Sequence, residues 1–134
     1  MTLPTIHIKF IPQKEQRFST PADWQIVDNL LTVWISEMAD PRYECIVLMH
    51  ELTEIIICWF DGVSSTDADA FDALWEKEIE AGLHNKIEEA GFDKRCCYRR
   101  GHVWGARMER LFCFILGVKW RDYEDYFNNY NYDQ

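Results

Sequence analysis

The alternation of apolar and polar residues divides the chain into a strand-rich N-terminal part and a longer helical part. Residues 5–11 and 30–36 are rich in β-branched and apolar side chains, and residues 23–27 are separated from the second of these segments only by Asp28-Asn29. Because Asp and Asn tolerate a positive φ, this pair predicts a hairpin turn. The three segments together predict a small, mostly antiparallel sheet.

Segments with helical periodicity follow the strands. Asp40-Pro41 is typical of a helix start, and Asp61-Gly62 is typical of a helix end, so we predict a helix over residues 41–60. Further helices are predicted over about 67–80, preceded by Thr66, and over 102–116, closed by Gly117, with a loop over 82–98 and a tail over 120–134 that begins as a short helix. The sequence therefore predicts one α+β domain over residues 1–134, with a small sheet packed on three or four helices.

From Cys45 to Phe60 the predicted helix is apolar on every side and is interrupted by His50, Glu51 and Glu54. A helix of this kind is buried, so its ionisable groups need partners. Residues four apart share one helix face, so His50 and Glu54 can bind the same metal ion, while Glu51 lies about 100° round the helix and can reach a ligand beside that ion. This is the geometry of the H-E-x-x-H helix of zinc peptidases, with glutamate in place of the second histidine.

A metal site needs at least one more protein ligand, and the sequence offers His102 at the start of the third helix. Glu109 lies two turns further along the same face, about 10 Å away, which is too far for both to bind one ion. We therefore expect His50, Glu54 and His102 to hold a divalent metal and Glu109 and Arg107 to support these ligands; the reverse assignment of His102 and Glu109 stays open. Zinc is the first candidate, and iron or manganese also suits this ligand set.

Composition narrows the location and the partners. The net charge is −9 and 48% of residues are hydrophobic, yet His50, Glu51 and Glu54 interrupt the only candidate membrane span, and no export signal precedes the strands. The five cysteines are odd in number and lack C-x-x-C spacing, so we expect reduced thiols in a cytoplasmic protein. The adjacent Cys96-Cys97 pair could instead ligate a metal or react.

The charges are unevenly placed. Residues 61–93 hold ten acids against two lysines, and residues 94–110 hold six basic residues against Glu109. We expect these two stretches to neutralise each other, which argues against a nucleic-acid partner. The alternative is that the basic stretch, with Tyr98 and Trp104, binds single-stranded nucleic acid by charge and stacking.

Two other uses of the buried polar residues stay open. The first is a hydrogen-bonded network without a metal, formed by His50, Glu54, Arg107 and Arg110. The second is a two-metal carboxylate site, in which Asp72 and Glu76, which share a helix face, join His50 and Glu54.

The motifs also resemble those of small uncharacterised proteins of phages and prophages, a resemblance that spans nearly the whole chain. The shared segments are Trp24 to Ser36, Asp40 to Glu54 with its H-E-L-x-E pattern, Phe71-Asp72, Tyr98 to His102 and Glu109 to Trp120. More distantly, the chain resembles a miniature zincin, the fold of H-E-x-x-H metalloproteases.

The zincin resemblance implies a zincin-like core and a metal-dependent hydrolase that acts on a peptide or amide bond, with Glu51 as the general base. The resemblance to phage proteins carries no activity. It supports the alternative of a non-enzymatic accessory protein in the host cytoplasm that binds a host or phage protein, with the His/Glu cluster in a structural role.

Overall fold

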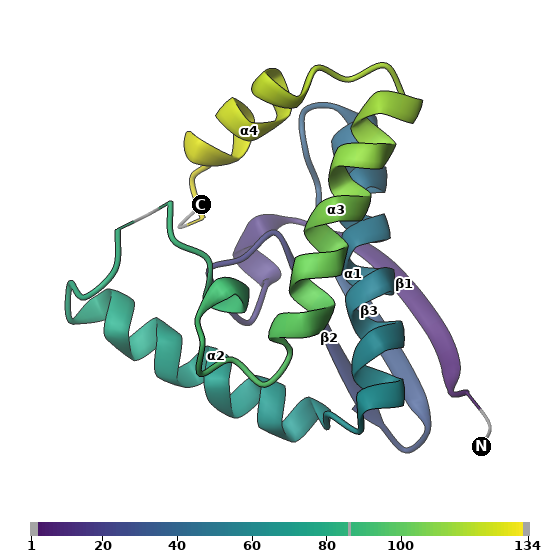
Figure 1. Cartoon of the computed structure of the whole chain (residues 1–134), viewed down its shortest axis with the longest axis vertical. Coiled ribbons are helices and arrows are strands. Elements are labelled where there is room, and N and C mark those ends of the chain that lie inside the picture. The colour runs from purple at the N-terminus through teal and green to yellow at the C-terminus, as the bar shows by residue number, and fades with distance from the viewer. Residues whose placement is uncertain (1–2, 86, 133–134) are drawn as a thin grey trace.

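A computed structural model describes residues 3–85 and 87–132 and confirms the α+β class (Figure 1). Three strands, β1 (Thr5–Ile11), β2 (Ala22–Val27) and β3 (Leu30–Ser36), are followed by four helices, α1 (Pro41–Asp61), α2 (Ser65–Glu80), α3 (Arg99–Ile115) and α4 (Trp120–Asn128). Two short 3-10 turns, η1 (Gln13–Glu15) and η2 (Ala90–Phe92), lie in the connections. Within the described residues, no helix combines the length and the apolar character needed to cross a bilayer.

The sheet is mixed, so the prediction of a mostly antiparallel sheet was wrong. The hairpin between β2 and β3 forms as predicted, with Asp28 and Asn29 at φ 52° and 59°, but β1 pairs parallel to β3 in the order β1-β3-β2. The connection over residues 12–21 leaves a gap one strand wide between β1 and β2. The hairpin then folds β3 back between β1 and β2, where it runs parallel to β1. Residue alternation reports the faces of a strand and not the order of strands, so this topology was not visible in the sequence.

The ends of the helices follow local capping chemistry. Asp40 caps α1 by accepting a hydrogen bond from the Arg42 backbone N–H at 2.9 Å, and Gly62 ends this helix with φ 74°, as predicted. The predicted start of α2 at Thr66 was wrong, because Ser64 accepts from the Asp67 N–H at 3.0 Å and the helix begins at residue 65.

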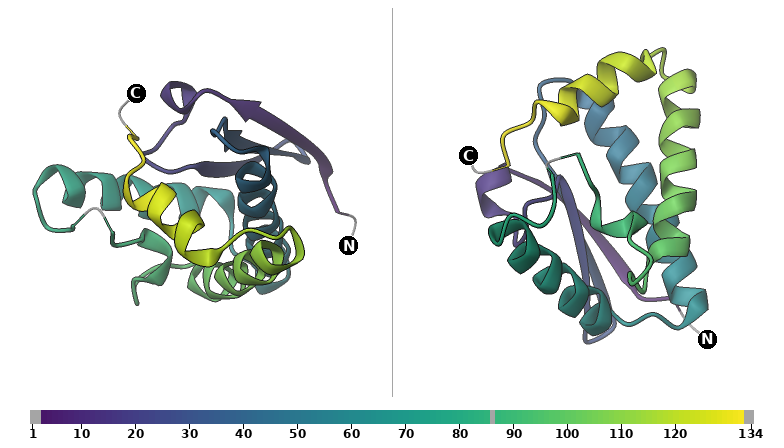
Figure 2. Two further views of the ribbon diagram at one scale, coloured as in Figure 1. Left: turned by 90° about the horizontal axis from the view of Figure 1, so that it is seen from above. Right: turned by 60° about the vertical axis from the view of Figure 1, so that its left-hand side comes forward.

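The helices form layers on one face of the sheet. Figure 2, seen from above, shows α1 between the sheet and α3, and α1 packs on both β2 and β3. The interface between α1 and α3 is the most extensive contact between any two helices. The most deeply buried side chains come from β3, α1, α3 and α4 and are Leu31, Val33, Ile35, Ser36, Ile46, Cys58, Cys113 and Tyr123.

The acidic and basic stretches are partners in part, as predicted. Arg95 pairs with Glu78 at 2.7 Å, and Arg100 pairs with Asp61 at 2.8 Å. Arg99 instead donates to the backbone carbonyl of Phe92 at 3.2 Å. The first pair joins the connection before α3 to α2, and the second joins the start of α3 to the end of α1.

The approach of α3 to α1 depends on glycine at position 101. A Cβ atom placed at Gly101 would lie 2.8 Å from the backbone oxygen of Glu54 and 3.1 Å from its Cα. Real Cβ atoms essentially never come this close to backbone, so any larger residue would push the two helices apart.

We predict that Gly101→Ala destabilises the protein by about 1–3 kcal/mol, because the added methyl meets backbone that cannot rotate away. In an unhindered helix the same change stabilises by about 1 kcal/mol, so the sign of the effect is diagnostic. Urea unfolding followed by circular dichroism measures it. The exposed Ala73→Gly in α2 serves as the control for ordinary helix propensity. Stabilisation by Gly101→Ala would show that the helices are not in tight contact there.

Candidate metal centre

Three side chains from α1 and α3 converge on one point inside the protein. The His50 Nε2 atom lies 3.2 Å from Glu54 Oε2 and 3.0 Å from His102 Nδ1, and the last two atoms are 3.1 Å apart. Among the described residues, this is the only group of three or more His, Cys, Asp or Glu side chains placed to share an ion. The structure thus brings together the three residues that the sequence predicted as ligands.

The size of this triangle fits a small divalent ion. Atoms about 3.1 Å apart lie about 1.8 Å from the centre of their triangle, while zinc binds nitrogen and oxygen at about 2.0–2.1 Å. One small ion could therefore contact all three donors at once. Three donors of this kind would leave the fourth position of a tetrahedral ion to a water or a ligand.

Each histidine has a carboxylate at its second ring nitrogen. The Nδ1 atom of His50 makes a short hydrogen bond with Glu109 Oε1, and the other oxygen of Glu109 accepts from the Tyr123 hydroxyl at 2.6 Å. The Nε2 atom of His102 lies 3.3 Å from Glu89 Oε1. Carboxylates placed in this way fix which nitrogen carries the proton and leave the other free to bind a metal.

Glu54 is also held in position by a residue of the sheet. Its Oε1 atom accepts a hydrogen bond from the indole Nε1 of Trp24 on β2 at 3.3 Å, so that Oε2 alone faces the two histidines. The side chains of His50, Glu54 and His102 are 6%, 5% and 11% exposed. The donors are therefore fixed in position and almost fully removed from water.

Glycines lie against the three converging residues. Beside Gly101, which contacts Glu54, a Cβ at Gly105 would lie 2.9 Å from the His50 ring, and one at Gly91 would lie 2.1 Å from the His102 ring. The spacing Gly101-x-x-x-Gly105 was visible in the sequence and marks a close helix contact. The close contact that this glycine spacing indicates was not predicted.

Three further supports of the site were not predicted from the sequence: Trp24, Glu89 and Tyr123. These residues belong to β2, to the segment before η2, and to α4. They reach the site only through tertiary packing, and we find no sequence signal that would have identified them.

The charge balance of the site favours a cation. Burial opposes the charged form of His50, but hydrogen bonds with Glu109 and Glu54 outweigh it and raise the pKa of His50 well above its ordinary value. Burial also opposes charge on His102, yet Glu54 and Glu89 raise the pKa of His102 to about 9. The two inward nitrogens are 3.0 Å apart, and two lone pairs facing each other at that distance repel. Without an ion the site must therefore hold protons, and a metal would replace them.

Burial opposes ionisation of Glu54 as well, but its hydrogen bonds with His102 and His50 lower its pKa to about 2. Glu54 is thus an anion across the physiological range and can serve as a charged ligand.

Glu51 lies in the same region but has no partner. It is 8% exposed, and no hydrogen bond joins it to any described residue. Burial, followed by the negative charge of Glu54, raises the pKa of Glu51 well above its usual range. A buried carboxyl without a partner is costly, and such groups are concentrated at functional sites.

Arg107 and Arg110 do not support this site, contrary to the sequence analysis. Both are exposed, and their guanidinium groups lie 4.2 Å from the ring centre of Trp104 and 4.4 Å from that of Trp120. Residues two apart on a helix point about 200° away from each other, so Arg107 cannot face α1 while Glu109 does. The metal-free network that was expected to include these two arginines is therefore wrong.

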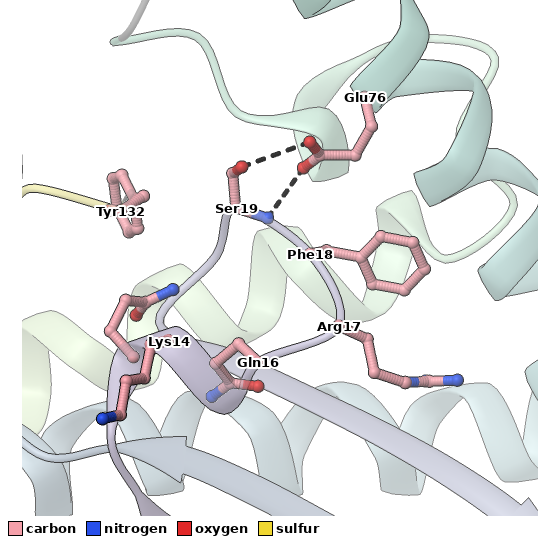
Figure 3. Close-up of a pocket in the computed structure, with 8 residues that line it drawn as sticks. Lys14, Gln16, Arg17, Phe18, Ser19, Glu76 and Tyr132 are labelled. Carbon is pink, nitrogen blue, oxygen red and sulfur yellow. Dashed lines mark hydrogen bonds between the residues drawn. The ribbon is translucent and has the colours of Figure 1, made fainter. Parts of the chain in front are cut away.

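The two-metal alternative is also wrong, because the α2 carboxylates have other partners. Asp72 accepts from the Tyr98 hydroxyl at 2.5 Å. Glu76 accepts from the Ser19 N–H at 2.8 Å and from its hydroxyl at 3.2 Å, in a polar pocket between α2 and the connection after β1 (Figure 3). Burial raises the pKa of Asp72 to about 7, so this carboxyl is held as a hydrogen-bonding group of the core.

The cysteines take no part in the site. All five are free thiols; Cys96 is buried and Cys97 is exposed. Burial raises the pKa of the Cys96 thiol to about 12, and neither Cys96 nor Cys97 belongs to the group of described side chains placed to share an ion. The alternative of a Cys96-Cys97 metal site therefore has no support in the structure.

A cleft of about 430 Å³ opens beside His102. Phe92 and Glu89 both line this cleft. The ring of Phe92 packs edge to face against the ring of His102, with 4.6 Å between ring centres, and Glu89 is the carboxylate at His102 Nε2. The remaining described residues of the wall are Trp75, Asn85, Ile87, Glu88 and Asp93. Displacement of Phe92 and Glu89 would connect this cleft to the candidate metal centre.

Comparison with known proteins adds no relative. No family model matches the chain, and no curated protein or solved structure matches it. The function must therefore be argued from the geometry of the site.

The pKa shift of His102 predicts how stability depends on pH. Folding raises this pKa from about 6.5 to about 9. Protonation of His102 therefore stabilises the metal-free protein fully below pH 6.5, and this stabilisation is lost as the pH rises through 9. We expect the free energy of unfolding in a chelator to fall by about 3 kcal/mol between pH 6.5 and 9. Saturating zinc should abolish this fall, because the bound nitrogens carry no proton. Urea titrations at both pH values measure the effect, and an equal loss with and without zinc would contradict it.

Proposed function

We propose that the chain is a metal-dependent hydrolase of zincin-like type that acts on a peptide or amide bond. The observation that carries this proposal is the convergence of His50, Glu54 and His102 at 3.0–3.2 Å, with a carboxylate at the far nitrogen of each histidine. Three protein ligands with one open position is the ligand count of catalytic zinc sites, whereas structural zinc sites have four.

The spacing of the residues on α1 suggests which of them bind the metal and which acts as the base. His50, Glu54 and His102 would hold the ion, which would supply Lewis-acid polarisation of a carbonyl and acidify a bound water. Glu51, one residue after His50 and without a hydrogen-bond partner, would accept the proton from that water and later deliver it to the leaving amine. Its raised pKa suits a group that must both take and give a proton near neutral pH.

The substrate would approach through the cleft beside His102. Its wall contains apolar Trp75, Ile87 and Phe92 as well as acidic groups, so it can accommodate an extended polar chain with an apolar side group. Opening the site requires movement of Phe92 and Glu89, which lie in an irregular connection and not in a long helix.

A second candidate is a site without catalysis, in a non-enzymatic accessory protein of phage type. The observation that favours it is the burial of the three donors, of which the most exposed residue, His102, is 9% exposed. An ion closed off in this way would fasten α3 to α1. The two candidates share the metal and differ in the role of Glu51.

We predict that the purified protein binds about one equivalent of zinc, iron or manganese, and that His102→Ala weakens this binding at least about 100-fold. Elemental analysis and competition with a zinc indicator measure both quantities. His84→Ala is the matched control, since His84 also lies between two carboxylates, Glu78 at 2.8 Å and Glu88 at 2.9 Å, but has no second histidine beside it. A protein that takes up no metal, or whose binding survives His102→Ala, would overturn the proposed site.

Glu51→Gln should retain the metal and the fold but reduce metal-dependent cleavage of a peptide mixture at least about 100-fold, because it removes the proton acceptor. Mass spectrometry of the mixture, with and without a chelator, gives the rate. Glu44→Gln, on the first turn of the same helix, is the control. Unchanged cleavage would exclude Glu51 as the base, and metal binding without any cleavage would favour the structural candidate.

A further inference from the structure

The outward side of α1 is unusual because it carries no charge. From Cys45 to Phe60 the ionisable side chains other than the exposed Cys45 thiol and the buried Cys58 are His50, Glu51 and Glu54, and all three are buried. Ile56 is 55% exposed and Phe60 is 66% exposed. Helices on protein surfaces normally place charged residues outward. Along about four turns, α1 instead buries its charged residues and exposes apolar ones.

The uncharged side has the spacing of a helix-packing surface. Cys45, Met49, Leu52, Ile56 and Phe60 are exposed or half-buried, and they follow one another at intervals of four, three, four and four residues. This alternation places the side chains in one stripe down the helix, as in the seam of two packed helices. The stripe is suited to a partner helix that lies along α1.

The apolar surface continues onto β1. In the parallel register Ile6, Ile8 and Phe10 are opposite Leu31, Val33 and Ile35, which are buried under α1, so the two rows share one face of the sheet. The β1 row is nonetheless 40–47% exposed, because α1 packs on β2 and β3 and leaves β1 open. Figure 2, seen from above, shows α1 between β1 and α3. We call the stripe of α1 and the row of β1 together the α1–β1 face.

The charge of the chain limits what can cover this face. With a net charge of −9, two copies repel each other wherever they meet through acidic surface, and a bilayer with anionic lipids repels the chain as well. Two copies that meet through an uncharged face repel each other less than two copies that meet through acidic surface.

The exposed area points the same way. The chain exposes 8062 Å², whereas a monomer of 16.0 kDa exposes about 7,400 Å². The excess over the whole surface is about 660 Å², somewhat less than the area of about 800 Å² that each partner buries in a standard interface.

We propose that the α1–β1 face binds a second copy of this chain in a two-fold symmetric dimer. We place the two-fold axis across the stripe near Leu52, its middle, and perpendicular to α1, which makes the two α1 helices antiparallel. Cys45 of one copy then faces Phe60 of the other, and the β1 rows cover the flanks of the contact. This dimer does not depend on the proposed metal.

Sedimentation equilibrium tests the assembly. We expect a species of two chains, and we expect Ile56→Glu to weaken association at least 100-fold, because it places a charge in the apolar contact. Leu83→Glu is the matched control: Leu83 is 67% exposed and belongs to the connection after α2. This connection begins at the end of α2 that lies away from β1 (Figure 1). Phe60→Glu is a second variant in case Ile56→Glu does not fold, with circular dichroism as the check. A monomer at 200 µM, or a dimer that is insensitive to both variants, would overturn the proposal.

Cross-linking tests the antiparallel arrangement. Cys45 is an exposed free thiol, so Phe60→Cys should form a disulfide between two copies under mild oxidation with diamide. Leu83→Cys should not form this bond to Cys45. Peptide mapping identifies the linked residues. A bond from the new cysteine of one copy to that of the other, in place of Cys45, would show a different arrangement and contradict the proposed axis.

Discussion

The structure depends on the close approach of α1 and α3. Gly101 and Gly105 allow the backbone of α3 to come so near to α1 that a Cβ at either position would lie within 3.0 Å of Glu54 or His50. Only at this separation can a histidine from α3 reach the same point as a histidine and a glutamate from α1. The sheet below, the capping of α1 by Asp40 and the hydrogen bond from Trp24 to Glu54 then hold the geometry that this contact creates.

The burial of ionisable groups along α1 has a matching feature on its opposite side. His50, Glu51 and Glu54 point inward. There Glu109 compensates His50 and Trp24 compensates Glu54, and His102, which is itself paired with Glu89, joins them. Although Ile46 and Ile55 are buried, other apolar residues of α1, among them Ile56 and Phe60, are left outside. The cost of a charged interior and of an apolar exterior must be met by binding, and the two proposed ligands, a metal on one side and a second copy on the other, would meet it.

Much of the helical architecture could be predicted from local patterns, because capping residues and periodicity act within a few positions. The bounds of α1 and the placement of His50 and Glu54 on one stripe follow in this way, and the convergence of His102 follows from the scarcity of other donors. The order of the strands could not be predicted, since β1 pairs with β3, and the connection over residues 12–21 and all of β2 lie between them in the sequence. The role expected of Arg107 was wrong for a reason that the sequence already contained, because this residue lies on the opposite side of α3 from Glu109. Glu89 and Tyr123 could not be found, because nothing in their neighbourhoods distinguishes them from surface residues.

Glu109 accepts hydrogen bonds from both the Tyr123 hydroxyl and the His50 ring, and this has a consequence for the order in which the protein is made. His50 leaves the ribosome early, but the carboxylate that orients its ring comes 59 residues later and the hydroxyl that orients this carboxylate comes 14 residues after that. During synthesis, His50 and Glu54 would therefore exist for some time as a pair without the groups that give them direction. The site becomes complete only when α4 docks, so a nascent chain cannot acquire the full set of contacts before almost all of its sequence has emerged.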